Sequence, residues 1–162
     1  MNFRIGEGWD SHALVSGRPL VLGGVTIAHS HGLQGHSDAD ALLHAITDAL
    51  LGAAGLGDIG THFSDTDPRF EGADSLTLLG ITGQLVGEAG YVVVNIDSTV
   101  VAEAPRMAPH IPLMRERIAL CLGLSAAQVN VKAKTAEGLG PAGERRSIEA
   151  RASCLLCQRA PG

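Results

Sequence analysis

The order of patterns along the chain constrains its fold most strongly, because segments with strand-like alternation are interleaved with segments of helical periodicity. The strand-type segments comprise residues 2–14, interrupted by glycines, a hairpin with a Gly-Gly turn at 20–27, and residues 91–103, 129–135 and 147–158. The helix-type segments comprise residues 40–54, 74–89 and 111–122. This interleaving predicts an α/β or α+β fold in which helices pack on one face of a sheet.

The composition predicts one compact domain with an aliphatic core. The 162 residues are 45% apolar but only 3% aromatic, and we find no domain boundary between residues 1 and 162. The net charge of −5 disfavours a nucleic-acid surface, and no apolar run is long enough to span a membrane. Residues 1–6 are typical of a strand rather than of a secretion or transit signal, so we expect a cytoplasmic protein.

The two faces of the predicted sheet differ in polarity. The apolar face, expected under the helices, carries Val92, Val94, Ile96 and Val100 in the clearest strand. The other face carries Asn95, Asp97, Thr99, Asn130, Lys132, Lys134, Glu149 and Arg151. That polar face meets either solvent or copies of the same chain in an oligomer, and the sequence favours neither.

The three cysteines fit a reducing compartment. Cys154 and Cys157 have the spacing of a metal or redox pair, but on a strand they would point to opposite faces. We therefore interpret them as small hydrophobic residues.

Asp10-Ser11-His12 lies on the first predicted strand, where residues i and i+2 project from the same face. The carboxylate and the imidazole form half of a zinc site, although the pattern also occurs as a surface Asp–His hydrogen bond. His44, beside the apolar stripe of the first helix, is either a core histidine or a third ligand. Three protein ligands with one open position are typical of catalytic zinc sites.

Polar residues flank His44 on the same helix. Asp40 and Asp48 lie one turn before and one turn after it, so either is expected to orient the imidazole, unless both are ordinary solubilising acids. Ser37 is the predicted N-cap, with Asp38 and Asp40 in the first turn.

Three segments are candidates for binding an anionic substrate. His36 and Ser37 form a polar lip before the first helix, beyond their capping role. The loop at 55–72 is dense in Gly, Asp and Pro, which is typical of a binding loop or of a turn-rich connection. Residues 132–137 end a strand with a hydroxyl and a carboxylate, which suit phosphate and Mg²⁺.

The ordered motifs resemble the 2-C-methyl-D-erythritol 2,4-cyclodiphosphate synthase family of the non-mevalonate isoprenoid pathway. The matching stretches are Arg4-Ile5-Gly6-x-Gly8-x-Asp10-x-His12 and residues 35–40, 43–50, 57–60, 65–68, 72–75, 104–107, 109–112 and 130–133. The resemblance implies an α+β two-layer sandwich with a mostly four-stranded, ferredoxin-like sheet, helices on one face and an N-terminal hairpin. It also implies a homotrimer with the sheets packed at its centre and the active sites between adjacent subunits.

The resemblance further implies a reaction and the residues that serve it. The 2-phosphate of 4-diphosphocytidyl-2-C-methyl-D-erythritol 2-phosphate would attack the β-phosphorus, closing a cyclic diphosphate and releasing CMP. Zinc would lie on Asp10, His12 and His44, and Mg²⁺ or Mn²⁺ would bind Glu137 with the diphosphate. The implied substrate-binding residues are His36, Ser37, Asp58, Ile59, Gly60, Phe63, Asp65 and Asp67, with His36 and Thr135 as catalytic residues. The neighbouring subunit's cytidine and diphosphate pocket would comprise Ala102, Arg106, Met107, Ala108, Ala133, Lys134 and Thr135.

Two places depart from the family's pattern. Arg106 stands where the family usually has Lys, which keeps a cation of different shape. Residues 141–148 replace an aromatic residue and a Gly-Arg-x-Glu-Gly run, with Glu144 and Arg146 at the Arg and Glu positions. This region resembles the wall of the family's central trimer cavity, which is proposed to hold an isoprenoid diphosphate. Because the run is altered here, the resemblance leaves open whether this chain binds that ligand.

Two other functions fit the same residues. A zinc-dependent phosphohydrolase would use the same ligands to activate water and would release CMP with an acyclic product. A catalytically silent sensor would bind a cytidine nucleotide or an isoprenoid diphosphate without turnover. The number of motifs that occur in the family's order favours the synthase.

Overall fold

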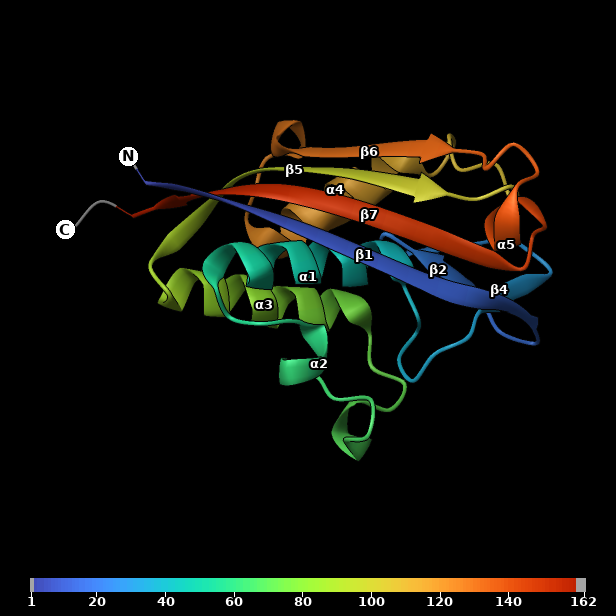
Figure 1. Ribbon diagram of the computed structural model, residues 1–162, viewed down its shortest axis with the longest axis horizontal. Helices are drawn as coiled ribbons and strands as arrows, with labels where there is room; N and C mark the ends of the chain where they lie inside the picture. Colours follow the sequence, from blue (N-terminus) through green and yellow to red (C-terminus); the bar gives the residue numbers. More distant parts are fainter. Residues whose placement is uncertain (1, 160–162) are drawn as a thin grey trace.

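The computed structural model describes residues 2–159, which form a five-stranded mixed sheet with helices against one of its faces (Figure 1). The strands are β1 (Phe3–Ser16), β4 (His31–Leu33), β5 (Tyr91–Val101), β6 (Val129–Lys134) and β7 (Ser147–Gln158). Their order is β4-β1-β7-β5-β6, and the β5–β6 pair is parallel while the other pairs are antiparallel. A separate hairpin joins β2 (Leu20–Leu22) to β3 (Val25–Ile27) through the predicted Gly-Gly turn.

The three long helices pack together on one side of this sheet (Figure 1). The long helices are α1 (Ala41–Ala54), α3 (Ser75–Glu88) and α4 (Ile111–Leu122). The short helices and 3-10 turns are α2 (Ile59–His62), α5 (Gly140–Gly143), η1 (Pro68–Phe70) and η2 (Ala126–Gln128). Helix α1 lies under β1 and β7 at the centre of the core, and 10 of its 14 residues are buried. No helix within residues 2–159 is long and apolar enough to cross a membrane.

The predicted helices and long strands are confirmed to within two residues at each end, with three corrections. The sheet has five strands rather than four, because residues 31–33 form the edge strand β4 against the end of β1. The glycines do not interrupt β1, which runs for 14 residues. The N-cap of α1 is Asp40 rather than Ser37, since the Asp40 carboxylate accepts a hydrogen bond from the backbone amide of Leu43.

A β-bulge changes which side chains of β5 face the core. The register of β5 against β7 shifts at Val93–Asn95, so one extra residue is inserted there and the side-chain alternation changes. Ile96 and Val100, beyond the bulge, are buried as predicted. Val92, before the bulge, is 40% exposed, so the prediction that it lies on the apolar face is wrong.

Strand β1 lies very close to α1 because glycines face the helix. A methyl group added to Gly6 or to Gly8 would lie 1.9 Å from a backbone carbonyl oxygen of α1, a distance that no side chain can occupy. Alternate residues of a strand share a face, so the next two side chains on this face are those of Asp10 and His12. The close approach of the two backbones thus brings these polar side chains against α1.

We predict that Gly8→Ala destabilises the protein, because the new methyl group must push β1 away from α1. Overpacking of this kind costs about 1–3 kcal/mol or more. The control is Gly52→Ala within α1, where an added methyl group meets nothing within 4 Å. That control should stabilise the protein by about 1 kcal/mol through higher helix propensity. Urea denaturation measures the free energy of unfolding of both variants, and equal free energies for the two would contradict the prediction.

Candidate metal centre

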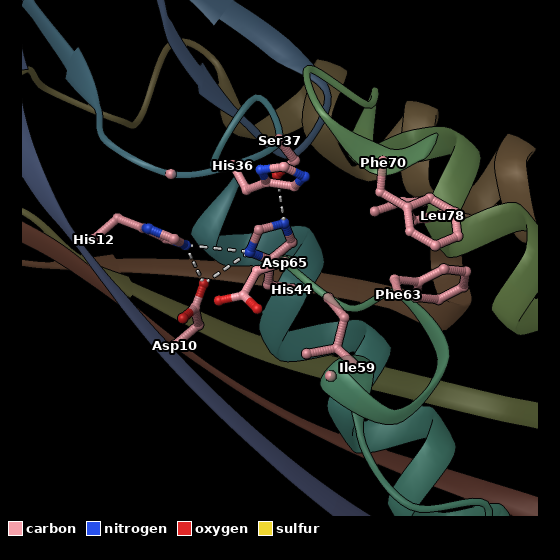
Figure 2. Close-up of a pocket in the computed structure, with 12 residues that line it drawn as sticks. Asp10, His12, His36, Ser37, His44, Ile59, Phe63, Asp65, Phe70 and Leu78 are labelled. Carbon is pink, nitrogen blue, oxygen red and sulfur yellow. Dashed lines mark hydrogen bonds and ion pairs between the residues drawn. The ribbon is translucent and has the colours of Figure 1, made fainter. Parts of the chain in front are cut away.

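Three side chains from β1 and α1 converge on one point (Figure 2). The Oδ2 atom of Asp10 lies 2.8 Å from Nε2 of His12 and 3.0 Å from Nδ1 of His44. The two imidazole nitrogens lie 3.2 Å apart. Within residues 2–159 this is the one group of His, Cys, Asp or Glu side chains whose ligand atoms are close enough to share an ion.

The donor set fits a divalent ion. Tetrahedral zinc with ligand bonds of about 2.0–2.2 Å separates its donor atoms by about 3.3–3.6 Å, so each edge of the triangle needs to lengthen by less than about 1 Å. Nδ1 of His12 lies 2.7 Å from the backbone carbonyl oxygen of Gln34. Because a carbonyl only accepts, Nδ1 carries the proton and Nε2 of neutral His12 presents its lone pair to the triad.

The triad is also electrostatically prepared for a positive charge. Burial alone would raise the pKa of Asp10, but the hydrogen bonds that the imidazoles of His12 and His44 donate to it when they are protonated outweigh this effect and hold the pKa of this carboxyl well below its usual range. Burial would lower the pKa of His12, yet its hydrogen bond to Asp10 raises that pKa above its usual value. An ionised carboxylate beside two imidazoles therefore favours a cation between them, either a proton or a metal ion.

The far nitrogen of His44 contacts two serines rather than the predicted acids. Nε2 lies 3.0 Å from Oγ of Ser75 and 3.2 Å from Oγ of Ser37. Ser75 belongs to α3 and was not among the predicted site residues. It stands at the start of a predicted helix, a position that indicates capping and gives no sign of a contact with His44.

The expectation that Asp40 or Asp48 orients the His44 imidazole is wrong. Asp40 is fully buried and accepts hydrogen bonds from the backbone amides of the Gly23-Gly24 turn, which ties the hairpin to α1. Asp48 accepts a hydrogen bond of 2.7 Å from the amide of Ile59 and so fixes the start of α2. Sequence spacing placed both acids on the helical face of His44, but neighbouring backbone amides compete for them.

The triad lies at a pocket of about 380 Å³ between α1, α2 and the segment before α3 (Figure 2). Six of the eight residues expected to bind the substrate line this pocket: His36, Ser37, Ile59, Gly60, Phe63 and Asp65. Its wall also includes Gly35, Phe70 and Leu78, which were not predicted. Figure 2 shows the triad with His36 and Ser37 at one end of the pocket and Phe63, Phe70 and Leu78 at the other, so one end is polar and the other is apolar.

The remaining two expected substrate-binding residues, Asp58 and Asp67, do not line the pocket of this chain. The Asp58 carboxylate caps α2 through hydrogen bonds to the amide and hydroxyl of Thr61. The Asp67 carboxylate pairs with Arg69 at 2.6 Å, and its backbone carbonyl lies 3.3 Å from Nε2 of His36. Asp67 thus contacts the pocket wall through its main chain.

The residues expected at a cytidine and diphosphate pocket are associated with β5 and β6, the two strands of the sheet farthest from β1. They lie near the ends of β5 and β6 and are Ala102, Arg106, Met107, Ala108, Ala133, Lys134, Thr135 and Glu137. None of them lines the metal pocket. Strand β6 is three positions from β1 in the sheet, which is about 14 Å at the usual strand spacing. Within one chain the two groups of residues therefore do not line a common pocket.

The segment at 141–148 spans most of α5 and the first two residues of β7. Arg146 pairs with Glu144 at 2.6 Å, and both side chains are more than half exposed. Arg145 adopts a left-handed backbone conformation with φ of 60°. The two charged residues that stand in reversed order in this run thus form an ion pair with each other at the surface.

The alternation of burial along β7 agrees with the interpretation of the cysteines. Cys154 is buried against α1, and its thiol donates a hydrogen bond of 3.1 Å to the carbonyl oxygen of Ala49. Burial raises the pKa of Cys154 to about 11. Cys157 is an odd number of residues away and partly exposed, so the two sulfurs do not form a pair.

Comparisons with known proteins agree on one family. A model of the YgbB family matches residues 3–157. The chain is 66% identical over 159 residues to a protein of Verminephrobacter eiseniae named 2-C-methyl-D-erythritol 2,4-cyclodiphosphate synthase, covering 97% of this chain and 87% of that protein.

Solved structures have the same fold. The bifunctional IspDF of Campylobacter jejuni matches with a TM-score of 0.94 and 41% identity over 97% of this chain, which spans only 42% of that longer chain. A 2C-methyl-D-erythritol-2,4-cyclodiphosphate synthase described as a CDP-bound form matches with a TM-score of 0.87 and 40% identity, covering 95% of this chain and 100% of that one.

We predict that His44→Ala abolishes binding of Zn²⁺ to the purified protein, because two ligands from β1 alone do not hold the ion tightly. The matched control is His36→Ala, which removes an imidazole from the same pocket but not from the triad. The control should retain the ion. Elemental analysis after dialysis measures the metal content, and a His44→Ala protein with full metal content would overturn the assignment.

Proposed function

The chain belongs to the YgbB family, and we infer from this membership that it is a 2-C-methyl-D-erythritol 2,4-cyclodiphosphate synthase. It converts 4-diphosphocytidyl-2-C-methyl-D-erythritol 2-phosphate to the cyclic diphosphate with release of CMP, a step of isoprenoid precursor synthesis. The structural observation that carries this assignment is the convergence of Asp10, His12 and His44 at a pocket that is polar at that end.

The triad is the proposed zinc site, because two imidazoles and one carboxylate are ligands that zinc accepts while leaving a position open. When bound, the ion supplies Lewis-acid polarisation of a phosphoryl oxygen. Phosphoryl transfer depends mainly on positioning the reacting groups and neutralising their charge. The surrounding side chains therefore act by binding and orienting the substrate.

The polar end of the pocket is suited to the methylerythritol phosphate. The Oγ atom of Ser37 accepts a hydrogen bond from the amide of Ala39, which leaves its own proton available for a phosphate oxygen. The His36 imidazole, which also lines the pocket, is a second donor for that group. Ile59, Gly60 and Phe63 form the wall against which the carbon chain would pack.

A second copy of the chain is proposed to complete the site. The expected nucleotide-binding residues near the ends of β5 and β6 do not line the pocket of the triad, which supports a role for them at the triad of another subunit. The sheet face without helices exposes Phe3, Ile5 and Trp9, with Ile5 at 79%. Apolar side chains on an open sheet favour burial in an oligomer, which supports the trimer with sheets at its centre.

Glu137 is the proposed ligand of Mg²⁺ for the diphosphate. Its carboxylate is exposed at the end of the β6 segment and accepts a hydrogen bond of 2.5 Å from the hydroxyl of Thr135. Mg²⁺ prefers carboxylate and phosphate oxygens together. The solved relative described as a CDP-bound form supports a cytidine nucleotide as part of the ligand.

The test of the reaction is incubation with the cytidine diphosphate substrate, Zn²⁺ and Mg²⁺, followed by phosphorus NMR. Cyclisation gives CMP and a cyclic diphosphate in equal amounts. CMP with an acyclic product would instead identify a phosphohydrolase. Binding of CDP without any product would identify a nucleotide sensor, and either outcome would overturn the synthase assignment.

We predict that Glu137→Gln lowers turnover by about 100-fold or more, because a neutral amide no longer holds the cation that balances the diphosphate charge. The zinc content should stay that of the parent, since Glu137 is outside the triad. The control is Glu116→Gln on the exposed surface of α4, which should leave turnover unchanged. Steady-state CMP release measures both variants, and unchanged turnover in Glu137→Gln would remove it from the magnesium site.

A further inference from the structure

Ser75 links the metal triad to an acidic residue outside the pocket. It is the first residue of α3, is 1% exposed, and places Oγ 3.0 Å from Nε2 of His44. The same Oγ donates a hydrogen bond to Oδ1 of Asp38. The other carboxylate oxygen of Asp38 accepts a hydrogen bond of 3.1 Å from the backbone amide of Ser75. A continuous chain of hydrogen bonds thus joins Asp38, Ser75 and His44.

The direction of the protons along this chain follows from the groups involved. An ionised carboxylate only accepts, so the hydroxyl proton of Ser75 points to Asp38. The lone pairs of Oγ are then left to accept, and the proton in the contact with His44 belongs to Nε2. A neutral imidazole with its proton on Nε2 has its lone pair on Nδ1, which lies 3.0 Å from Oδ2 of Asp10.

The second serine at this nitrogen does not perform the same task. Oγ of Ser37 lies 3.2 Å from Nε2 and accepts a hydrogen bond from the amide of Ala39, and no carboxylate within residues 2–159 accepts its hydroxyl proton. Its hydroxyl can therefore turn toward a substrate. Ser75 is held on two sides by Asp38, so its acceptor geometry toward His44 is fixed.

We propose that Asp38 and Ser75 are positioning residues that hold His44 in the Nε2–H tautomer, with the Nδ1 lone pair directed to the metal position. The backbone carbonyl of Gln34 correspondingly holds His12 in the Nδ1–H tautomer, with the Nε2 lone pair directed to the metal position. Without Ser75, the ionised Asp10 attracts the imidazole proton to Nδ1 and converts a ligand atom into a donor. The proposal rests on the metal-holding role of the triad and not on the identity of the substrate.

The first test is the affinity for Zn²⁺ of the purified protein without substrate, measured in competition with a chelator. Loss of a group that orients a metal-binding imidazole costs about 10–100-fold in affinity. Ser75→Ala and Asp38→Asn should both show a loss of this size. Two variants are used so that poor folding of one leaves the other as the test.

The matched control is Asp74→Ala. Asp74 is the N-cap of α3, next to Ser75, and its carboxylate accepts the amide of Leu76 at 2.9 Å. Its loss loosens the same helix start without breaking the hydrogen bonds to His44. The midpoint temperature of thermal unfolding should therefore be lower in Asp74→Ala than in the parent, while the affinity for Zn²⁺ should be unchanged.

The second test detects the tautomer directly. Nitrogen-15 NMR of the histidine side chains, in metal-free protein at mildly alkaline pH, distinguishes the Nε2–H from the Nδ1–H form of His44. The Nε2–H form should be more populated in the parent than in Ser75→Ala. A purely structural role of Ser75 would not change this population.

Equal tautomer populations in the parent and Ser75→Ala, or a loss of Zn²⁺ affinity in Asp74→Ala as large as in Ser75→Ala, would overturn the proposal. The proposal would also be overturned if Ser75→Ala and Asp38→Asn both bound Zn²⁺ with the affinity of the parent. A parent protein that binds Zn²⁺ but does not cyclise the substrate would contradict the proposed function and leave this inference standing.

Discussion

The close approach of β1 to α1 is the constraint on which the site depends. Gly6 and Gly8 let the strand backbone lie against the carbonyl groups of the helix, where any side chain would collide. The alternation of the strand then carries Asp10 and His12 along the same face, and His44 meets them from the helix. The packing of the core therefore sets the dimensions of the metal position.

Hydrogen bonds outside the triad determine its protonation. Each imidazole directs one nitrogen toward the metal position. Its other nitrogen forms a hydrogen bond with an oxygen atom, which is the backbone carbonyl of Gln34 for His12 and the hydroxyl of Ser75 for His44. The inward lone pairs and the ionised Asp10 then form a set of acceptors that favours a cation. Asp40 contributes from further away, because it fastens the hairpin turn to the helix that carries His44.

Only part of this arrangement was predictable from the sequence. The spacing of Asp10 and His12 indicated a shared strand face, and the helical stripe placed His44 beside the core. The same reasoning offered Asp40 or Asp48 as a partner of His44, although both carboxylates accept hydrogen bonds from backbone amides elsewhere. It gave no role to Ser75, because a serine at a helix start has an ordinary capping explanation. Strand β4 was missed because three residues are too few to establish a period.

The sequence by itself determined the order and type of the elements, the pairing of Asp10 with His12, and the glycines that permit close packing. These features are local, since periodicity and turn chemistry act over a few residues. The tertiary structure alone decided which hydrogen-bond partner each polar side chain takes and which residues share a pocket. Partners for Asp40, Asp48 and His44 come from segments distant along the chain, and competition among them is settled only when the elements pack together.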